Sequence, residues 1–188
     1  MQRIFATLLF WTLILCACST GVASPQTVHP SPTATYFALP TTAVPPDSRG
    51  CAFQWAYKDL PELSSSFEQS IQTLQPEAQA NASAYGENCI RADGSVANFF
   101  ARETDFNLTL QVDDLADESV LGEWIVQAMQ AIENIPAEQI AGRGPGRVSI
   151  VFQSGTAQSK VIFEAYKYQV LPAGLSNTEI YMALKTPQ

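Results

Sequence analysis

The sequence is poor in the side chains on which most enzyme chemistry depends. It has one histidine, His29, which lies in a segment rich in proline, threonine and serine. We therefore expect no Ser-His-Asp or Cys-His arrangement and no histidine-ligated zinc or haem after it. The sequence also lacks the GK[ST] ending of a phosphate loop, and no GxGxxG follows a predicted strand. These absences exclude most hydrolase and oxidoreductase designs, predict no cofactor, and leave carboxylate chemistry.

Basic residues are also scarce. The chain has 10 lysines and arginines against 18 aspartates and glutamates, a formal net charge of -8. Nucleic acids and anionic lipid headgroups are bound through Lys and Arg that neutralise phosphates. The sequence therefore predicts no nucleic-acid partner.

A long apolar run occurs near the N-terminus, from Ile4 to Leu15, after a short segment that contains Arg3. As a helix this run rises about 18 Å, whereas the hydrocarbon core of a bilayer is about 30 Å thick. It is too short for a stable span, and its length is typical of a cleaved signal peptide.

The four residues that follow, Leu15-Cys16-Ala17-Cys18, resemble the lipobox of bacterial lipoproteins. The matching features are a leucine three positions before the acceptor cysteine, a small residue directly before it, and Cys18 as the acceptor. The resemblance implies that residues 1–17 are a signal peptide and that Cys18 carries acyl chains such as palmitate. It also implies a lipid-anchored protein of the cell envelope, on the extracytoplasmic side of the membrane. The alternative is an ordinary secretory signal peptide cleaved nearby.

The segment 19–50 is rich in proline, threonine and serine. Proline fixes φ and removes hydrogen-bond donors, so such a segment is extended and solvated. We expect residues 18–50 to be a lipidated cysteine followed by a disordered tether, and residues 51–188 to be one folded domain.

Two cysteines remain for the domain once Cys16 leaves with the signal peptide and Cys18 takes the lipid. In an oxidising compartment Cys51 and Cys89 are expected to form a disulfide. A redox or metal pair is the alternative, but the CxxC spacing and a nearby histidine are both missing.

Hydrophobic periodicity predicts the order of elements in the domain. Alternating side chains after Cys51 indicate a short opening strand, and Asp59 with Pro61 indicates the start of a helix. Asp93-Gly94 is typical of a hairpin turn, and Asp117 and Ser176 of helix N-caps. The predicted elements are strand 51–57, helix 60–74, hairpin arms 80–92 and 96–112, helix 118–135, strands 148–152 and 160–170, and a short helix from 176.

This order of helix, hairpin, helix, hairpin predicts an α+β fold. We expect a two-layer sandwich in which one antiparallel sheet of four to five strands has two long helices on one face.

Two groups of acidic residues are candidate sites. Asp113, Asp114, Asp117 and Glu118 are candidate calcium ligands, because calcium prefers several carboxylate oxygens. The alternative, which we favour, is that Asp117 caps the second helix and Glu118 interacts with its dipole. The second group is Glu103 and Asp105, which share one strand face as an acid/base pair does, or are simply solvated.

Two further features suggest binding. Arg143 and Arg147 flank the glycine-rich segment 142–146, which either receives an anion or is a plain connection, the reading we favour. The domain also has more aromatic residues than one sheet face needs. The aromatic residues considered for a binding surface are Trp55, Tyr57, Tyr85, Phe99, Phe100, Tyr166, Tyr168 and Tyr181.

From these observations we expect a membrane-anchored lipoprotein with a non-catalytic binding domain. Its partner would be an extracytoplasmic protein, peptide or glycan. The alternatives are a carboxylate-dependent hydrolase and a calcium-binding structural module.

Overall fold

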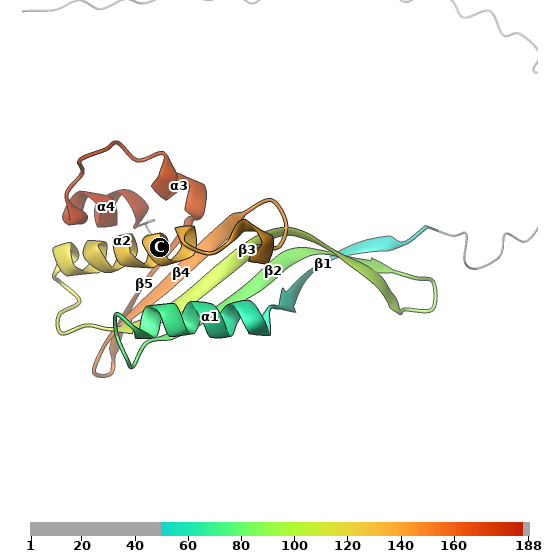
Figure 1. Ribbon diagram of the computed structural model, residues 1–188, viewed down its shortest axis with the longest axis horizontal. Helices are drawn as coiled ribbons and strands as arrows, with labels where there is room; N and C mark the ends of the chain where they lie inside the picture. Colours follow the sequence, from blue (N-terminus) through green and yellow to red (C-terminus); the bar gives the residue numbers. More distant parts are fainter. Residues whose placement is uncertain (1–49, 186–188) are drawn as a thin grey trace, which may run out of the picture. The chain divides into compact units, whose positions relative to one another are not determined.

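The computed structural model describes residues 50–185. They form a mixed α/β structure in which helices pack against one five-stranded, curled sheet (Figure 1). None of the helices between Gly50 and Lys185 is long and apolar enough to cross a bilayer. In chain order the elements are β1 (Ala52–Asp59), α1 (Pro61–Gln72), β2 (Gln79–Ile90), β3 (Val96–Gln111), α2 (Glu118–Glu133), the 3-10 helix η2 (Ala137–Gln139), β4 (Pro145–Ser154), β5 (Ala157–Glu164), α3 (Ala165–Gln169) and α4 (Asn177–Leu184).

The strands lie in the sheet in chain order, β1-β2-β3-β4-β5. β1 with β2, β2 with β3 and β4 with β5 are antiparallel, but β3 and β4 are parallel. The prediction of a wholly antiparallel sheet is therefore wrong at this pair. After β3 ends at Gln111 the chain returns through α2, so that β4 begins opposite Thr104 in the middle of β3, and a long helical connection of this kind permits parallel pairing. Periodicity alone does not reveal which strands become neighbours.

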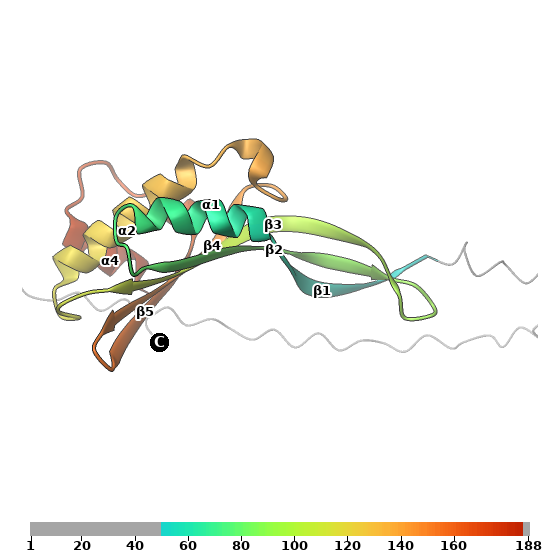
Figure 2. The same ribbon diagram turned by 60° about the horizontal axis from the view of Figure 1, so that its bottom comes forward.

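The hydrophobic core lies between one face of the sheet and the helices. Figures 1 and 2 show α1 and α2 over the same side of the sheet. Alternate residues of the central strands point to this side, as a pleated strand requires. The buried core residues of the sheet are Ala80, Ala82, Phe106, Leu108, Leu110, Val148, Ile150, Phe152, Val161 and Phe163, and those of α1 and α2 are Leu63, Phe67, Ile71, Leu121, Ile125, Ala128, Met129 and Ile132.

Two of the three predicted helix N-caps are present in the structure. The Asp117 carboxylate accepts from the backbone N–H groups of Ser119 and Val120, so it caps α2 as predicted. Ser176 forms the predicted capping box with Glu179 at the start of α4. The prediction for Asp59 is wrong, because this residue ends β1 and the N-cap position of α1 is Leu60, which has no side-chain cap bond.

The segment predicted as strand 160–170 contains a strand and a helix. β5 ends at Glu164, and α3 follows directly. Ala165, Tyr168 and Leu171 all pack on the core, and their spacing of three is the period of a helix rather than of a strand. The aromatic residues of this segment obscured that period in the sequence.

The predicted disulfide between Cys51 and Cys89 is confirmed, with the two Cα atoms 5.0 Å apart. It joins the residue directly before β1 to the end of β2, and this end of the sheet extends beyond α1 (Figure 1).

Candidate functional site

The face of the sheet opposite the helices has an exposed group of aromatic side chains near the disulfide. We call this group the aromatic strip and define it by its residues. They are Phe53, Trp55 and Tyr57 of β1, Tyr85 of β2 and Phe100 of β3.

Strand alternation places the β1 and β2 members on this face. Trp55 lies opposite Glu87 and Tyr57 opposite Tyr85, and directly opposed residues of paired strands point to the same side. The odd-numbered residues of β2 therefore point away from the helices, because Ala80 and Ala82 are in the core.

Phe100 joins the strip through an irregularity in β3. In the pairing with β2, Tyr85 lies opposite Glu103 but Gly86 lies opposite Ala101, so Arg102 is an extra residue. An extra residue in one strand reverses the side to which its alternate residues point. Phe106 and Leu108, after this bulge, face the core, whereas Phe100, just before it, faces the open side.

The rings of the strip contact one another and remain accessible. Trp55 stacks on Tyr85 with ring centroids 5.1 Å apart. The ring centroids of Tyr57 and Tyr85 are 5.0 Å apart. Phe53 and Phe100 are 6.2 Å apart. Phe53, Trp55, Tyr57 and Phe100 are 63%, 56%, 53% and 50% exposed. A cluster of large exposed rings is typical of an interaction surface.

An ion pair borders the strip. Nη2 of Arg102 lies 3.0 Å from Oε1 of Glu87, and the Arg102 guanidinium carbon is 5.8 Å from the Trp55 ring centroid. Because it is the extra residue of the bulge, Arg102 reaches both groups on the open side. The cation therefore lies within reach of the Trp55 ring face and of the Glu87 carboxylate at once.

A second cation connects β4 to the strip. Nη2 of Arg147 donates to the Tyr57 hydroxyl at 2.9 Å and lies 3.4 Å from Oδ2 of Asp105. The backbone N–H of Arg147 also donates to Asp105, at 2.8 Å. Asp105 is only 2% exposed, so its charge is held by this arginine. An anion site at Arg143 and Arg147 is the less favoured of the two sequence interpretations, and here the Arg147 side chain pairs with a carboxylate of the protein.

Glu103 lies beside this pair. Burial raises the pKa of its carboxyl above the ordinary value of 4.5, the nearby charges of Asp105 and Glu164 raise it further, and Arg147 lowers it. Gly146 makes the arrangement possible, because a Cβ at that position would overlap the Glu103 and Asp105 side chains.

Glu103 and Asp105 do share the open face, as the sequence predicted, but in unequal environments. Asp105 is buried and lies beside Arg147, so a ligand on the open face has little access to its carboxylate. Glu103 is less buried than Asp105 and lies beside it, and it forms no ion pair of its own within residues 50–185.

The glycine-rich segment 142–146 is tied to β3. The backbone N–H of Arg143 donates to the carbonyl of Arg102 at 2.9 Å, and that of Thr104 donates to the carbonyl of Gly144 at 3.0 Å. The Arg143 amide is therefore already bonded, which favours a plain connection over an anion cradle.

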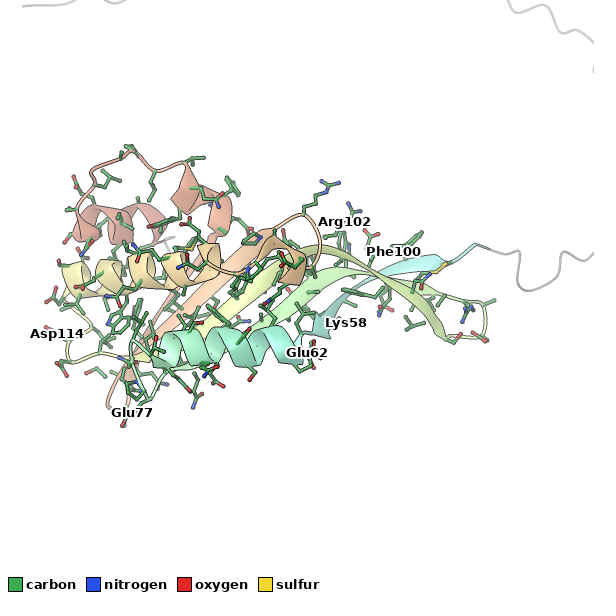
Figure 3. All side chains as sticks on the ribbon, in the orientation of Figure 1. Lys58, Glu62, Glu77, Phe100, Arg102 and Asp114 are labelled. Atoms are coloured by element: carbon green, nitrogen blue, oxygen red, sulfur yellow. A yellow bond between two sulfur atoms is a disulfide. The ribbon has the colours of Figure 1, made fainter. Side chains whose placement is uncertain are left out.

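The acidic segment lies at the other end of the sheet from the strip. Figure 3 shows Asp114 and Glu77 far from Phe100 and Arg102. Asp114 accepts from the N–H of Ala116, and Asp117 caps α2. Within residues 50–185, no three histidine, cysteine, aspartate or glutamate side chains are grouped to hold a metal ion. Asp114 and Asp117 instead bond to nearby backbone N–H groups, and Glu118 lies in the first turn of α2, where an acid is favoured by the helix dipole.

The remaining aromatic candidates divide by burial. Tyr181 is in the core, Tyr168 packs against it, and Tyr166 is exposed on α3, outside the strip. Phe99 of β3 is half-buried and points to the other side of the sheet from Phe100. Phe53 and Arg102 were not predicted for a binding surface, and the alternation of β1 was the signal that pointed to Phe53. Cys18 and His29 lie outside the described residues.

In comparisons with known proteins, no protein family, no curated protein and no solved structure matches this chain.

Proposed function

We propose that this protein is a membrane-anchored, extracytoplasmic lipoprotein whose folded domain binds a protein, peptide or glycan without catalysing a reaction on it. The observation that supports this best is the aromatic strip, whose four most exposed rings are each at least half accessible. Rings held in this way lose little conformational entropy when a ligand covers them.

In this proposal the fold acts as a two-layer α+β sandwich. The helices cover one face of the sheet, and the other face is left for the ligand. The lipid on Cys18 and the segment up to residue 50 hold this face outside the membrane.

The anchor is tested by Cys18→Ser. Without the acceptor thiol no acyl chain is attached, so the variant should leave the membrane fraction while the parent stays in it. Cell fractionation followed by mass spectrometry of the mature N-terminus measures this. A variant retained in the membrane as firmly as the parent would show that the lipobox resemblance is misleading.

The binding surface is tested by Trp55→Ala on immobilised peptides and oligosaccharides. We expect the parent to bind to ligands of one of these two classes. The affinity of the Trp55→Ala variant for the same ligands should be at least about tenfold lower, because large rings dominate such interfaces. Tyr166→Ala is the matched control, since Tyr166 is 58% exposed but outside the strip. Equal retention of parent and Trp55→Ala would remove the strip as the binding surface.

A further inference from the structure

β1 has a free edge beside the aromatic strip. It is the terminal strand of the sheet, and all of its residues pair with β2, from Ala52 opposite Ile90 to Asp59 opposite Ser83. No other strand within residues 50–185 pairs with its second edge. In an antiparallel strand, alternate residues direct their N–H and C=O groups away from the partner, so this edge has a row of backbone groups without a strand partner.

This edge lacks the usual features that protect an exposed strand. β1 contains no proline, its register with β2 has no bulge, and its charged residues, Lys58 and Asp59, are confined to its C-terminal end. Large apolar side chains occupy the alternate positions instead. A regular, apolar edge strand of this kind is a template for adding another strand.

The edge is also fixed at both ends. The disulfide between Cys51 and Cys89 ties the start of β1 to β2, and the Tyr57 hydroxyl accepts from Arg147 near its other end. A rigid edge loses little entropy on pairing, which favours binding.

The charges around the edge indicate the kind of partner that fits. The guanidinium of Arg102 already lies beside the carboxylate of Glu87, and that of Arg147 beside the carboxylate of Asp105. The chain as a whole has a net charge of -8 and repels acidic segments. An uncharged or basic partner is therefore complementary to this surface.

We propose that the ligand of the strip is an extended, uncharged or basic polypeptide segment that pairs with the free edge of β1 as a sixth strand. Its backbone bonds to the edge, and the side chains on one of its faces pack against Phe53, Trp55 and Tyr57. A glycan can stack on these rings, but it cannot satisfy a row of amide and carbonyl groups at strand spacing. This inference names the ligand class for the proposed binding function and rests on it.

The test uses two synthetic probes with the same side chains. One is a ten-residue peptide of alternating threonine and valine with a central tyrosine and a terminal lysine. The other has ester bonds in place of its alternate amides, which removes hydrogen-bond donors and leaves the side chains unchanged. Calorimetry on the mature chain in detergent gives each Kd, and amide chemical shifts of β1 locate the contact.

We expect the peptide to bind with shifts along β1, and the ester analogue to bind at least about tenfold more weakly, because several backbone hydrogen bonds are lost together. Trp55→Ala should weaken binding of the peptide, whereas Tyr166→Ala should leave its Kd unchanged. Reduction of the disulfide should also weaken binding, because it releases the start of the edge.

Other outcomes overturn the inference. Equal affinity for both probes, with Trp55→Ala weakening both, means that the strip binds through side chains alone and leaves the proposed function intact. No peptide binding, together with Trp55-dependent retention by an oligosaccharide, replaces the polypeptide with a glycan. A concentration-dependent dimer that excludes the peptide assigns the edge to a second copy of this chain.

Discussion

At the scale of single residues, Arg102 decides how the strip is assembled. As the extra residue of the β3 bulge it brings Phe100 to the open side, and its own guanidinium pairs with Glu87 beside Trp55. One inserted residue therefore supplies both a member of the strip and the cation that borders it.

Glu103 gives a prediction about pH at the same scale. Its folded-state pKa is above the ordinary value of 4.5, chiefly because of burial, so the folded protein holds this proton more tightly than the unfolded chain does. The resulting stabilisation is fully present below pH 4.5 and is lost as the pH rises through the folded pKa. Glu103→Gln removes the ionisation, so it should raise Tm relative to the parent at neutral pH, with the difference vanishing below pH 4.5.

Thermal unfolding across this pH range measures the effect. Glu138→Gln, at an exposed position in η2, is the control and should leave Tm unchanged at each pH. A Glu103→Gln variant that is less stable than the parent at neutral pH would mean that the ionised carboxylate stabilises the fold through Arg147.

At the scale of elements, the start of α2 distinguishes helix capping from calcium binding. Asp117→Ala should lower the free energy of unfolding by about 1 kcal/mol, because two backbone N–H groups lose their acceptor. Asp117→Asn should retain most of the stability, since asparagine caps helices about as well as aspartate. Chemical denaturation with and without calcium measures both effects.

The asparagine variant makes this test specific. A calcium site would bind its ion more weakly after loss of the Asp117 charge. The calcium-binding alternative is therefore supported if calcium stabilises the parent but does not stabilise the Asp117→Asn variant. We expect calcium to have no effect on either protein.

The parallel pairing of β3 with β4 is decided by the connection between the two strands. Each strand has a clear alternating pattern, yet that pattern is the same for a parallel and an antiparallel neighbour. The direction follows from α2, which returns the chain along β3, so that β4 begins opposite Thr104.

At the scale of the whole molecule, the disulfide braces the end of the sheet that extends beyond α1. It joins residues 38 positions apart, and in the chain-entropy model such a loop closure is worth about 3–4 kcal/mol. The double variant Cys51→Ser/Cys89→Ser should be less stable by about this amount, as measured by denaturant unfolding.

Reductant supplies the control for this prediction. It should lower the stability of the parent to that of the double variant and leave the double variant unchanged. A parent equally stable with and without reductant would show that the strands hold this end without the cross-link.

The sequence by itself determined the local features of this protein. The cap at Asp117, the capping box at Ser176, the turn at Asp93-Gly94 and the Cys51–Cys89 disulfide depend on short-range chemistry or on counting cysteines, and all four are present. The alternating segments also predicted most of the strands, because the period of two is a direct consequence of the pleat.

Only the tertiary structure decided how these parts meet. The bulge at Arg102, the parallel pairing of β3 with β4 and the contact of Arg147 with Tyr57 and Asp105 join residues far apart in the chain. The sequence shows which residues are aromatic but not which of them are buried and which are exposed, because that depends on which face of the sheet the helices cover. The aromatic strip exists because α1 and α2 lie on one side of the sheet, and β1 ends the sheet with its rings on the other.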